Sequence, residues 1–405
     1  MSLKKRKVKR RIKTVIIPLC MIVCLFVGFT LGNVYSIIGW NKGTIFDAKS
    51  LTKLQLLQQY VDQFYLNEVE KEKVVNLTYK GMIVGLDDPY SAYYTKEEYD
   101  TMMQSLEGNY YGIGVLCTQD QTTGEIVVLN AFKKGSAYEA GIRSGDRILK
   151  VDGESIAGYD FETIISKIKG EEGTKVTLTV YQESSKKQKQ FVVERRETEN
   201  ETVTSELFSD KIGYIKVSEF SDVTARQFDE AIDALEQKGM EGLIIDLRNN
   251  GGGLLTSAQT MLDRLLPKCR IAYSEDKNGK REDYFAKDDE TFDKPLVILV
   301  NGQSASASEL FSGAIKDYKA GTLVGTKTFG KGIIQSIFRL QDGSAIKLTV
   351  AKYYTPNGVC IHGTGIEPDV TVELPKDVGV SLDFDHKKDT QLNKAMEVLK
   401  QKMQR

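Results

Sequence analysis

A serine that follows a buried strand is the first residue here whose setting suits covalent chemistry. The apolar run Leu296–Val300 predicts a buried strand, and a turn of small residues leads from it to Ser306 and a predicted helix over 308–318. Free N–H groups at a helix start favour developing negative charge, and small neighbours let a substrate backbone approach. Ser306 is therefore a candidate nucleophile, although a serine at a helix start is by itself more often an N-cap.

A nucleophilic serine needs a base, and histidine is scarce in this chain of 405 residues, which has only His362 and His386. Lys331 is the one lysine set between glycines and followed directly by apolar residues. Burial lowers the pKa of a lysine, so its neutral amine becomes available as a base. A surface lysine in a glycine turn is the ordinary alternative.

Two glycine-rich loops accompany these residues. Residues 246–253 (Asp-Leu-Arg-Asn-Asn-Gly-Gly-Gly) leave a predicted strand, and their N–H groups could form an oxyanion hole or simply make a turn. Asp246 and Arg248 could brace this loop as an ion pair. Residues 325–331 match most of the sequence motif of a phosphate-binding P-loop. However, Gly332 replaces its Ser/Thr and a strand is predicted over 333–340, so the sequence argues against nucleotide binding.

The elements that must position these residues fall into three regions. Residues 50–106 have helical periodicity, whereas 108–194 have short strands and glycine turns, with a solvated hairpin tip over 184–190. From about 198 onward strands alternate with helices, which predicts an α/β layer. An amphipathic helix over 388–405 could pack on the body or on a second subunit.

The N-terminal sequence predicts where in the cell the protein lies. Eight of the 55 basic residues lie in 1–13, which has no acidic residue, and a charge-free apolar run follows from about 15 to 31. This pattern predicts a transmembrane anchor with the rest of the chain outside, and a cleaved signal peptide is the alternative.

The composition of the rest of the chain excludes other classes of protein. It has 47 basic and 56 acidic side chains, so it lacks the excess of positive charge that is typical of nucleic-acid-binding proteins. Five scattered cysteines predict neither disulfides nor a zinc site.

Together these motifs resemble the C-terminal processing (tail-specific) serine peptidases, which use a Ser/Lys catalytic pair. The resemblance runs from about residue 55 to 375, and residues 108–195 resemble the family's PDZ domain. It rests on Asp88-Pro89-Tyr90-Ser91, 304–309, Gly330-Lys331-Gly332 with Gln335 after it, 353–358 and 365–369.

The resemblance implies roles for individual residues. Ser306 would be the nucleophile and Lys331 the general base, with Gln335 positioning the lysine and Glu309 supporting the site. The N–H groups of Ala307 and Gly252 would form the oxyanion hole. The PDZ loop at Ile113, Gly114 and Val115, whose N–H groups could also bind a terminal carboxylate on physical grounds, would hold the substrate's C-terminus.

The sequence departs from the family pattern at a few positions. Gly251 stands where the family usually has proline, and the closing segment differs at Val359, Cys360 and His362. These differences affect the details of two loops and leave the Ser/Lys pair in place.

The prediction is an α/β peptidase core with an inserted β-rich PDZ domain, a helical N-terminal region and one transmembrane helix. We expect an endopeptidase without a cofactor, acting on proteins with accessible C-termini at the outer side of a bacterial cytoplasmic membrane, and able to form homo-oligomers. A catalytically silent PDZ scaffold is the alternative. The predicted boundaries are 1–13 basic tail, 14–38 anchor, 45–106 helical region, 107–197 PDZ domain, 198–375 peptidase core and 376–405 helical tail.

Overall fold

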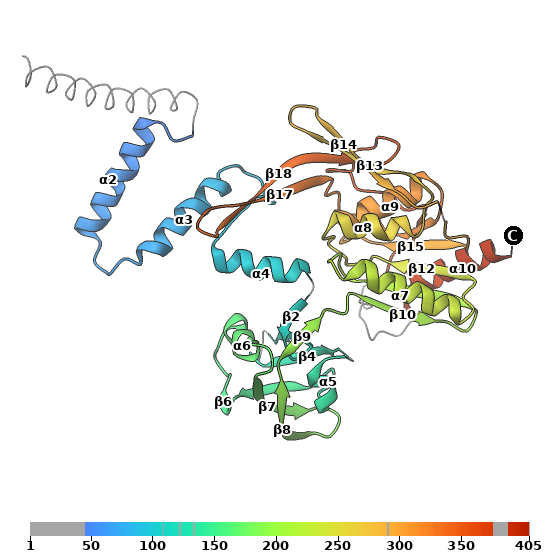
Figure 1. Cartoon of the computed structure of the whole chain (residues 1–405), viewed down its shortest axis with the longest axis horizontal. Helices are drawn as coiled ribbons and strands as arrows, with labels where there is room; N and C mark the ends of the chain where they lie inside the picture. The colour runs from blue at the N-terminus through green and yellow to red at the C-terminus, as the bar shows by residue number, and fades with distance from the viewer. Residues whose placement is uncertain are drawn as a thin grey trace, which may run out of the picture. The chain divides into compact units, whose positions relative to one another are not determined.

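The computed structural model describes residues 45–107, 109–120, 123–132, 134–289, 291–375 and 388–404 (Figure 1). The chain divides into two compact units, Met1–Val75 and Asn76–Arg405. In the first unit, α2 (Ala48–Phe64) has no buried residue, and α3 (Lys71–Val84) begins there. Within the described ranges no helix combines the length and apolar character needed to cross a membrane, and the predicted anchor at 14–38 lies outside them.

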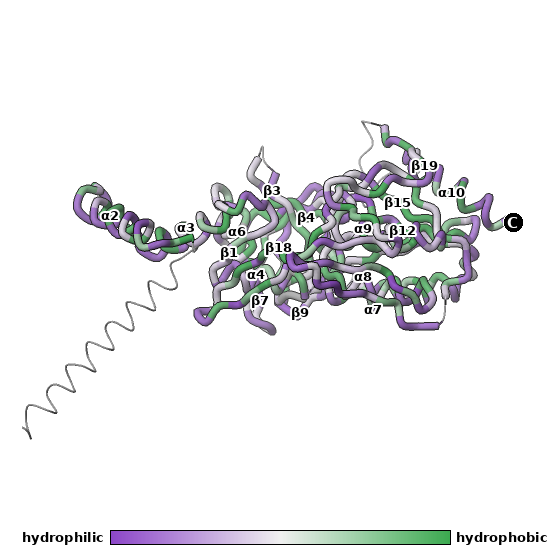
Figure 2. The backbone as a smooth tube through the Cα atoms, turned by 90° about the horizontal axis from the view of Figure 1, so that it is seen from above, coloured by the Kyte–Doolittle hydropathy of each residue, from purple (hydrophilic) through white to green (hydrophobic). Residues whose placement is uncertain are grey.

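A six-stranded sheet forms the centre of the larger unit. Its inner strands, β12 and β15, are buried at every position, which explains their continuous apolar sequences (Figure 2). All neighbours are parallel except the antiparallel pair at one edge. The order is β10 (Val203–Leu207), β11 (Ile212–Val217), β12 (Gly242–Asp246), β15 (Leu296–Val300), β16 (Thr322–Gly325) and β19 (Val370–Thr371).

Helices cover both faces of this sheet. Apolar residues of α7 (Thr224–Gln237), α8 (Leu255–Asp263) and α9 (Ala307–Asp317) share one core with alternate strand residues. Residues of α10 (Thr390–Met403) pack with the intervening residues on the opposite face. The predicted α/β layer is thereby confirmed, and the apolar face of the C-terminal helix packs on the body of its own chain.

A second, antiparallel sheet lies beside the α/β layer. Its strands are β1 (Ala92–Tyr94), β13 (Cys269–Asp276), β14 (Arg281–Ala286), β17 (Ile333–Arg339) and β18 (Ala345–Tyr354). The helical prediction for 50–106 is wrong at β1, which pairs with β18 more than 250 residues later. Local periodicity cannot report such a pairing, because the partner strand decides it.

Residues between α4 (Lys96–Glu107) and β10 form a separate β-rich body with its own hydrophobic core. Its sheet has the order β3 (Val115–Gln119), β4 (Ile126–Ala131), β5 (Arg147–Val151), β7 (Lys175–Gln182) and β8 (Lys187–Glu194), and β6 (Glu154–Ser155) pairs with β5. The helices α5 (Ser136–Ala140) and α6 (Phe161–Ile168) belong to the same body, and β2 (Asn109–Gly112) pairs with β9 (Arg196–Glu199). Because β8 begins at Lys187, the predicted hairpin tip at 184–190 is shorter than expected.

Candidate active site

Ser306 occupies the predicted position between β15 and α9. It is the N-cap of α9, is half-buried, and has a positive φ of 56°, a conformation that costs energy in a residue with a side chain. Gly252 lies directly against it, since a Cβ atom built there would meet Ser306 Cβ at 2.8 Å and the Ala305 carbonyl oxygen at 2.7 Å. The glycine loop and the serine turn therefore form one compact site, as the sequence predicts.

The buried carboxylate of Glu309 joins the serine turn to the lysine loop. Its Oε2 accepts hydrogen bonds from the N–H of Ser306 (3.0 Å) and from the N–H of Lys331 (2.7 Å). Its Oε1 accepts from the Thr328 hydroxyl (2.6 Å) and the Gly330 N–H (2.7 Å). Glu309 is fully buried, so its position depends on all four donors. The support expected of Glu309 thus consists of fixing two backbone segments relative to each other.

Tyr353 makes a second link between the same two segments. Its hydroxyl lies 2.6 Å from the Ser306 carbonyl oxygen and 2.8 Å from the Lys331 carbonyl oxygen, so its proton can be donated to either. Burial raises the pKa of Tyr353 well above its usual range, and the Glu309 carboxylate adds to this effect. The hydroxyl therefore stays protonated. Tyr353 belongs to a motif that marks the family, but the sequence did not reveal this role.

Lys331 is half-buried, and its pKa lies below the ordinary value of 10.5. Burial is the main cause and the positive charge of Lys347 contributes, whereas Asp88 and Glu309 oppose the shift. Lys331 Nζ lies 4.8 Å from the ring centre of Tyr90. Among the described residues, no hydrogen bond joins this amine to the Ser306 hydroxyl.

Gln335 lies at a β-bulge of β17, opposite Thr349 of β18. Its Nε2 is buried and has no hydrogen-bond partner in the part of the chain that the structure describes, and the same holds for Thr349 Oγ1. A buried donor without a partner is costly, so this carboxamide is available to a group that enters the site. Its role as the positioning residue of Lys331 stays a prediction.

The two predicted oxyanion donors differ in this structure. Within the described ranges the Ala307 N–H has no hydrogen-bond partner, as befits the start of a helix. The Gly252 N–H, however, donates to Asn250 Oδ1 at 2.9 Å. Asn250 is fully buried, and its Nδ2 donates to the Val217 carbonyl oxygen. Gly252 therefore lies at the predicted place, but its N–H is bound by Asn250. The sequence did not predict this hydrogen bond.

The strand that carries the glycine loop is braced by buried charges. Asp246 and Arg248 form the predicted ion pair, at 2.6 Å between Arg248 Nη2 and Asp246 Oδ2. The structure adds a second carboxylate, since Arg248 Nη1 lies 2.8 Å from Asp389 Oδ2, at the N-cap of α10. All three side chains are fully buried. The start of the C-terminal helix is thus held by Arg248, which lies two residues before Asn250 in the glycine loop.

The loop Ile113, Gly114 and Val115 of the β-rich body has the backbone expected of a carboxylate-binding turn. Gly114 has a φ of 75° and approaches Gly135 so closely that a Cβ atom would lie 2.6 Å from Gly135 Cα. Over the described residues, the N–H groups of Ile113 and Gly114 have no hydrogen-bond partner. In the part of the chain that the structure describes, the edge strand β3 that follows pairs only with β4.

Comparisons with known proteins agree with this arrangement. The profile of peptidase family S41 matches residues 211–372, that of the PDZ domain matches 127–182, and that of the activating protease CtpB N-terminal domain matches 39–98. Carboxy-terminal processing protease CtpA of Bacillus subtilis (strain 168) is 36% identical over 370 residues, which cover 91% of this chain and 78% of CtpA. The chain belongs to peptidase family S41.

One further relative supports the assignment, and one solved structure shares the fold. Carboxy-terminal processing protease CtpB of the same organism is 35% identical, over 81% of this chain and 68% of CtpB. The crystal structure of an S41 protease relative from Bacteroides fragilis NCTC 9343 shares the fold, with a TM-score of 0.52 and 18% identity, over 78% of this chain and 87% of the other. The protein is therefore a C-terminal processing serine peptidase of the S41 family with a PDZ domain.

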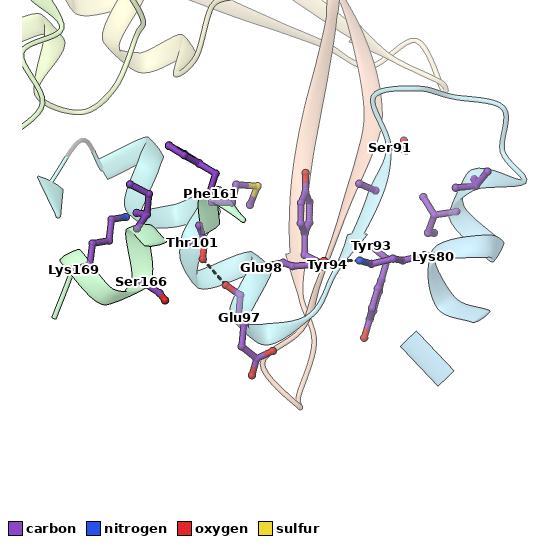
Figure 3. A pocket seen from close by; sticks show the side chains of 15 residues that line it. Lys80, Ser91, Tyr93, Tyr94, Glu97, Glu98, Thr101, Phe161, Ser166 and Lys169 are labelled. Atoms are coloured by element: carbon purple, nitrogen blue, oxygen red, sulfur yellow. Dashed lines mark hydrogen bonds and ion pairs between the residues drawn. The ribbon is translucent and has the colours of Figure 1, made fainter. Parts of the chain in front are cut away.

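Two cavities adjoin the elements of this S41 peptidase. One, of about 610 Å³, has a lining that includes Asp88, Tyr90, Ile333, Thr349 and His362. The other, of about 820 Å³, is lined by residues of α3, β1, α4 and the PDZ helix α6. Figure 3 shows Lys80 and Glu98, which form an ion pair, in the second cavity, together with Phe161 from α6.

Proposed function

We propose that this S41 peptidase cleaves peptide bonds with Ser306 as nucleophile and Lys331 as general base. The observation that carries the proposal is the Glu309 carboxylate, which holds the N–H of Ser306 and the N–H of Lys331 on one oxygen atom. The lowered pKa of Lys331 supplies the neutral amine that a base requires.

The proposed reaction has the following steps. Neutral Lys331 takes the Ser306 proton as Oγ attacks the peptide carbonyl carbon, and the ammonium then protonates the leaving amine. Water next hydrolyses the acyl-enzyme, with Lys331 again acting as the base. The Ala307 N–H stabilises the oxyanion, and the Gly252 N–H joins it once Asn250 releases that group. Loss of one such donor typically costs about 100- to 1000-fold in kcat.

The PDZ domain is proposed to hold the C-terminus of the substrate. The N–H groups of Ile113 and Gly114, which have no partner among the described residues, suit a terminal carboxylate, and the edge of β3, starting at Val115, suits an added peptide strand. The substrates are then proteins with an accessible C-terminus. Gly114→Ala should raise KM for such proteins while kcat for a short peptide is unchanged, because φ at Gly114 is positive.

Residues 14–38 are proposed to anchor the enzyme in a bacterial cytoplasmic membrane, with the catalytic part outside. The apolar run and its basic N-terminal flank support this topology. Membrane fractionation and protease digestion of intact cells and spheroplasts test it. Recovery of the mature chain without residues 1–38 would favour the cleaved signal peptide instead.

The enzyme is also proposed to form homo-oligomers. Leu51, Leu54, Leu57, Val61 and Phe64 are exposed on α2, which has no buried residue. Apolar side chains that are exposed together on one element often mark an interaction site. Light scattering of the purified chain should give a multiple of 45.3 kDa, and charged substitutions at Leu54 and Leu57 should yield the monomer.

The experiment that tests the proposed chemistry compares the full-length wild type with Ser306→Ala and Lys331→Ala on casein from pH 6 to 10, with fragments identified by mass spectrometry. Both variants should be folded and inactive. Cleavage by Lys331→Ala at the wild-type rate would exclude this lysine as the base. A folded wild type inert toward casein, even with C-terminal peptides added, would favour a PDZ scaffold.

A further inference from the structure

The turn formed by residues 87–91 lies against the base, although more than 200 residues separate the two in sequence. The Asp88 carboxylate accepts hydrogen bonds from the Tyr90 N–H (3.0 Å) and the Ser91 hydroxyl. The Ser91 hydroxyl in turn accepts from the Thr349 N–H of β18 at 3.1 Å. The turn is thereby fixed to the strand that faces Gln335. Its conformation is set by the protein, not by solvent.

The turn presents a negative face to the lysine. Tyr90 offers its ring at 4.8 Å from Lys331 Nζ, within the range of a cation–π interaction. Burial raises the pKa of Asp88, but the hydrogen bonds from Ser91 and Tyr90 and the charge of His362 outweigh this effect, so the pKa lies below 3.8. Asp88 is therefore ionised at neutral pH, and its charge acts on Lys331. Both groups favour the ammonium form of the lysine.

The same arrangement leaves the catalytic groups incompletely partnered. Gln335 Nε2 is buried without a partner, and no hydrogen bond joins Lys331 Nζ to Ser306 Oγ within the described part of the chain. A buried donor left open at a site is best explained by a group that arrives later. In the proposed mechanism the amine of Lys331 must come within hydrogen-bond distance of Ser306 Oγ, so the position of the lysine in this structure is a resting one.

We propose that Asp88 and Tyr90 are positioning residues for the base. They hold the Lys331 ammonium in a resting position, and the side chain leaves this position when the amine loses its proton. This inference rests on the proposed role of Lys331. The other charged groups that act on the amine are Lys347 from β18, which disfavours the ammonium, and Glu309 from α9, which favours it. Loss of the Tyr90 ring or of the Asp88 charge removes stabilisation from the ammonium alone.

The test uses full-length Tyr90→Leu, Asp88→Asn and Tyr90→Phe, with kcat/KM measured across pH 6 to 10. Tyr90→Leu removes the ring face, and Asp88→Asn removes the charge but keeps an acceptor for the Tyr90 N–H. Each should shift the midpoint of the rising limb of the profile to a pH that is lower by about 0.3 to 0.7 unit. This shift raises kcat/KM at pH 7 by about 2- to 5-fold. Tyr90→Phe keeps the ring and should match the wild type.

A second readout is independent of catalysis. In a Ser306→Ala background, the rate of acetylation of Lys331 by acetic anhydride, followed by peptide mapping at each pH, gives the pKa of its amine. This pKa should fall by the same amount in Tyr90→Leu and Asp88→Asn. The inference is overturned if the labelling midpoint is unchanged in both, or if activity falls with the midpoint unmoved.

Failure of this inference and failure of the proposed function are distinguishable. Activity in Lys331→Ala would remove Lys331 as the base, but the labelling experiment would still report whether the turn holds its ammonium. If Tyr90→Leu fails to fold, as judged by circular dichroism, Asp88→Asn decides the matter, because it changes one atom of a half-buried side chain.

Discussion

The hydroxyl of Tyr353 lies 2.6 Å from the backbone carbonyl oxygen of Ser306. The same hydroxyl lies 2.8 Å from the carbonyl oxygen of Lys331, so one phenol on β18 lies between the proposed nucleophile and the proposed base. Glu309 contacts the N–H groups of the same two residues. The backbones of Ser306 and Lys331 are therefore bridged on both their donor and their acceptor sides, which fixes the separation of their Cα atoms.

Tyr353→Phe should lower kcat/KM by about 10- to 100-fold, because a small displacement of a catalytic group is costly. The loss of stability should be modest, at about 0.5 to 1.5 kcal/mol for one hydrogen bond. Peptide cleavage and urea unfolding measure the two effects. Tyr284→Phe is the matched control, since its hydroxyl bonds Ser274 on another strand pair and its removal should leave activity intact. Equal activity in both variants would contradict the role of Tyr353.

Glu309→Gln should abolish activity and destabilise the fold by about 2 to 4 kcal/mol. The amide nitrogen of glutamine cannot accept, so one pair of donors that now bonds the carboxylate is left unsatisfied in a buried place. Chemical unfolding and casein cleavage check both effects. Glu236→Gln, which alters a half-exposed ion pair with Lys294, should cost about 1 kcal/mol or less and keep activity.

Activity should rise with pH, with a midpoint below 10.5, because the neutral amine of Lys331 is the active form in the proposed mechanism and its pKa is lowered. Lys347→Gln removes a positive charge that lowers this pKa, so the midpoint should move up by about 0.3 to 0.5 pH unit. The pH profile of kcat/KM measures this shift, and Lys402→Gln on α10 should leave it in place. A downward shift in Lys347→Gln would show that another group controls the profile.

Asp389→Ala should destabilise the core by about 3 to 5 kcal/mol, because it leaves buried Arg248 with one carboxylate in place of two. Asp389→Asn retains the acceptor for the Leu392 N–H at the start of α10 and should cost less. Thermal unfolding compares them with Glu397→Ala, which removes an exposed ion pair with Lys394 and an exposed hydrogen bond from Gln401. A cost near zero for Asp389→Ala would mean that α10 is held by its apolar face alone.

Much of the fold could be predicted from periodicity. The parallel strands β12 and β15 are continuous apolar runs because helices cover both faces of the sheet, so the sequence alone marked them as buried. The β13–β14 hairpin was not predicted from the sequence, because its strands are partly exposed and carry charged residues such as Arg270, Asp276 and Glu282. Strand β1 is three residues long and exists through its pairing with β18.

The sequence by itself determined which residues could do the chemistry. Ser306 follows a buried strand, Lys331 lies between glycines, and Asp246 and Arg248 stand two positions apart on one strand end, so local spacing sufficed to single them out. Only the tertiary structure decided what holds these residues. Tyr353, Asp389 and the turn at 87–91 reach the site from separate parts of the chain, through hydrogen bonds and charges that depend on distance in space. Spacing along the chain carries no record of such contacts, because side chains far apart in sequence meet only after the sheets have formed.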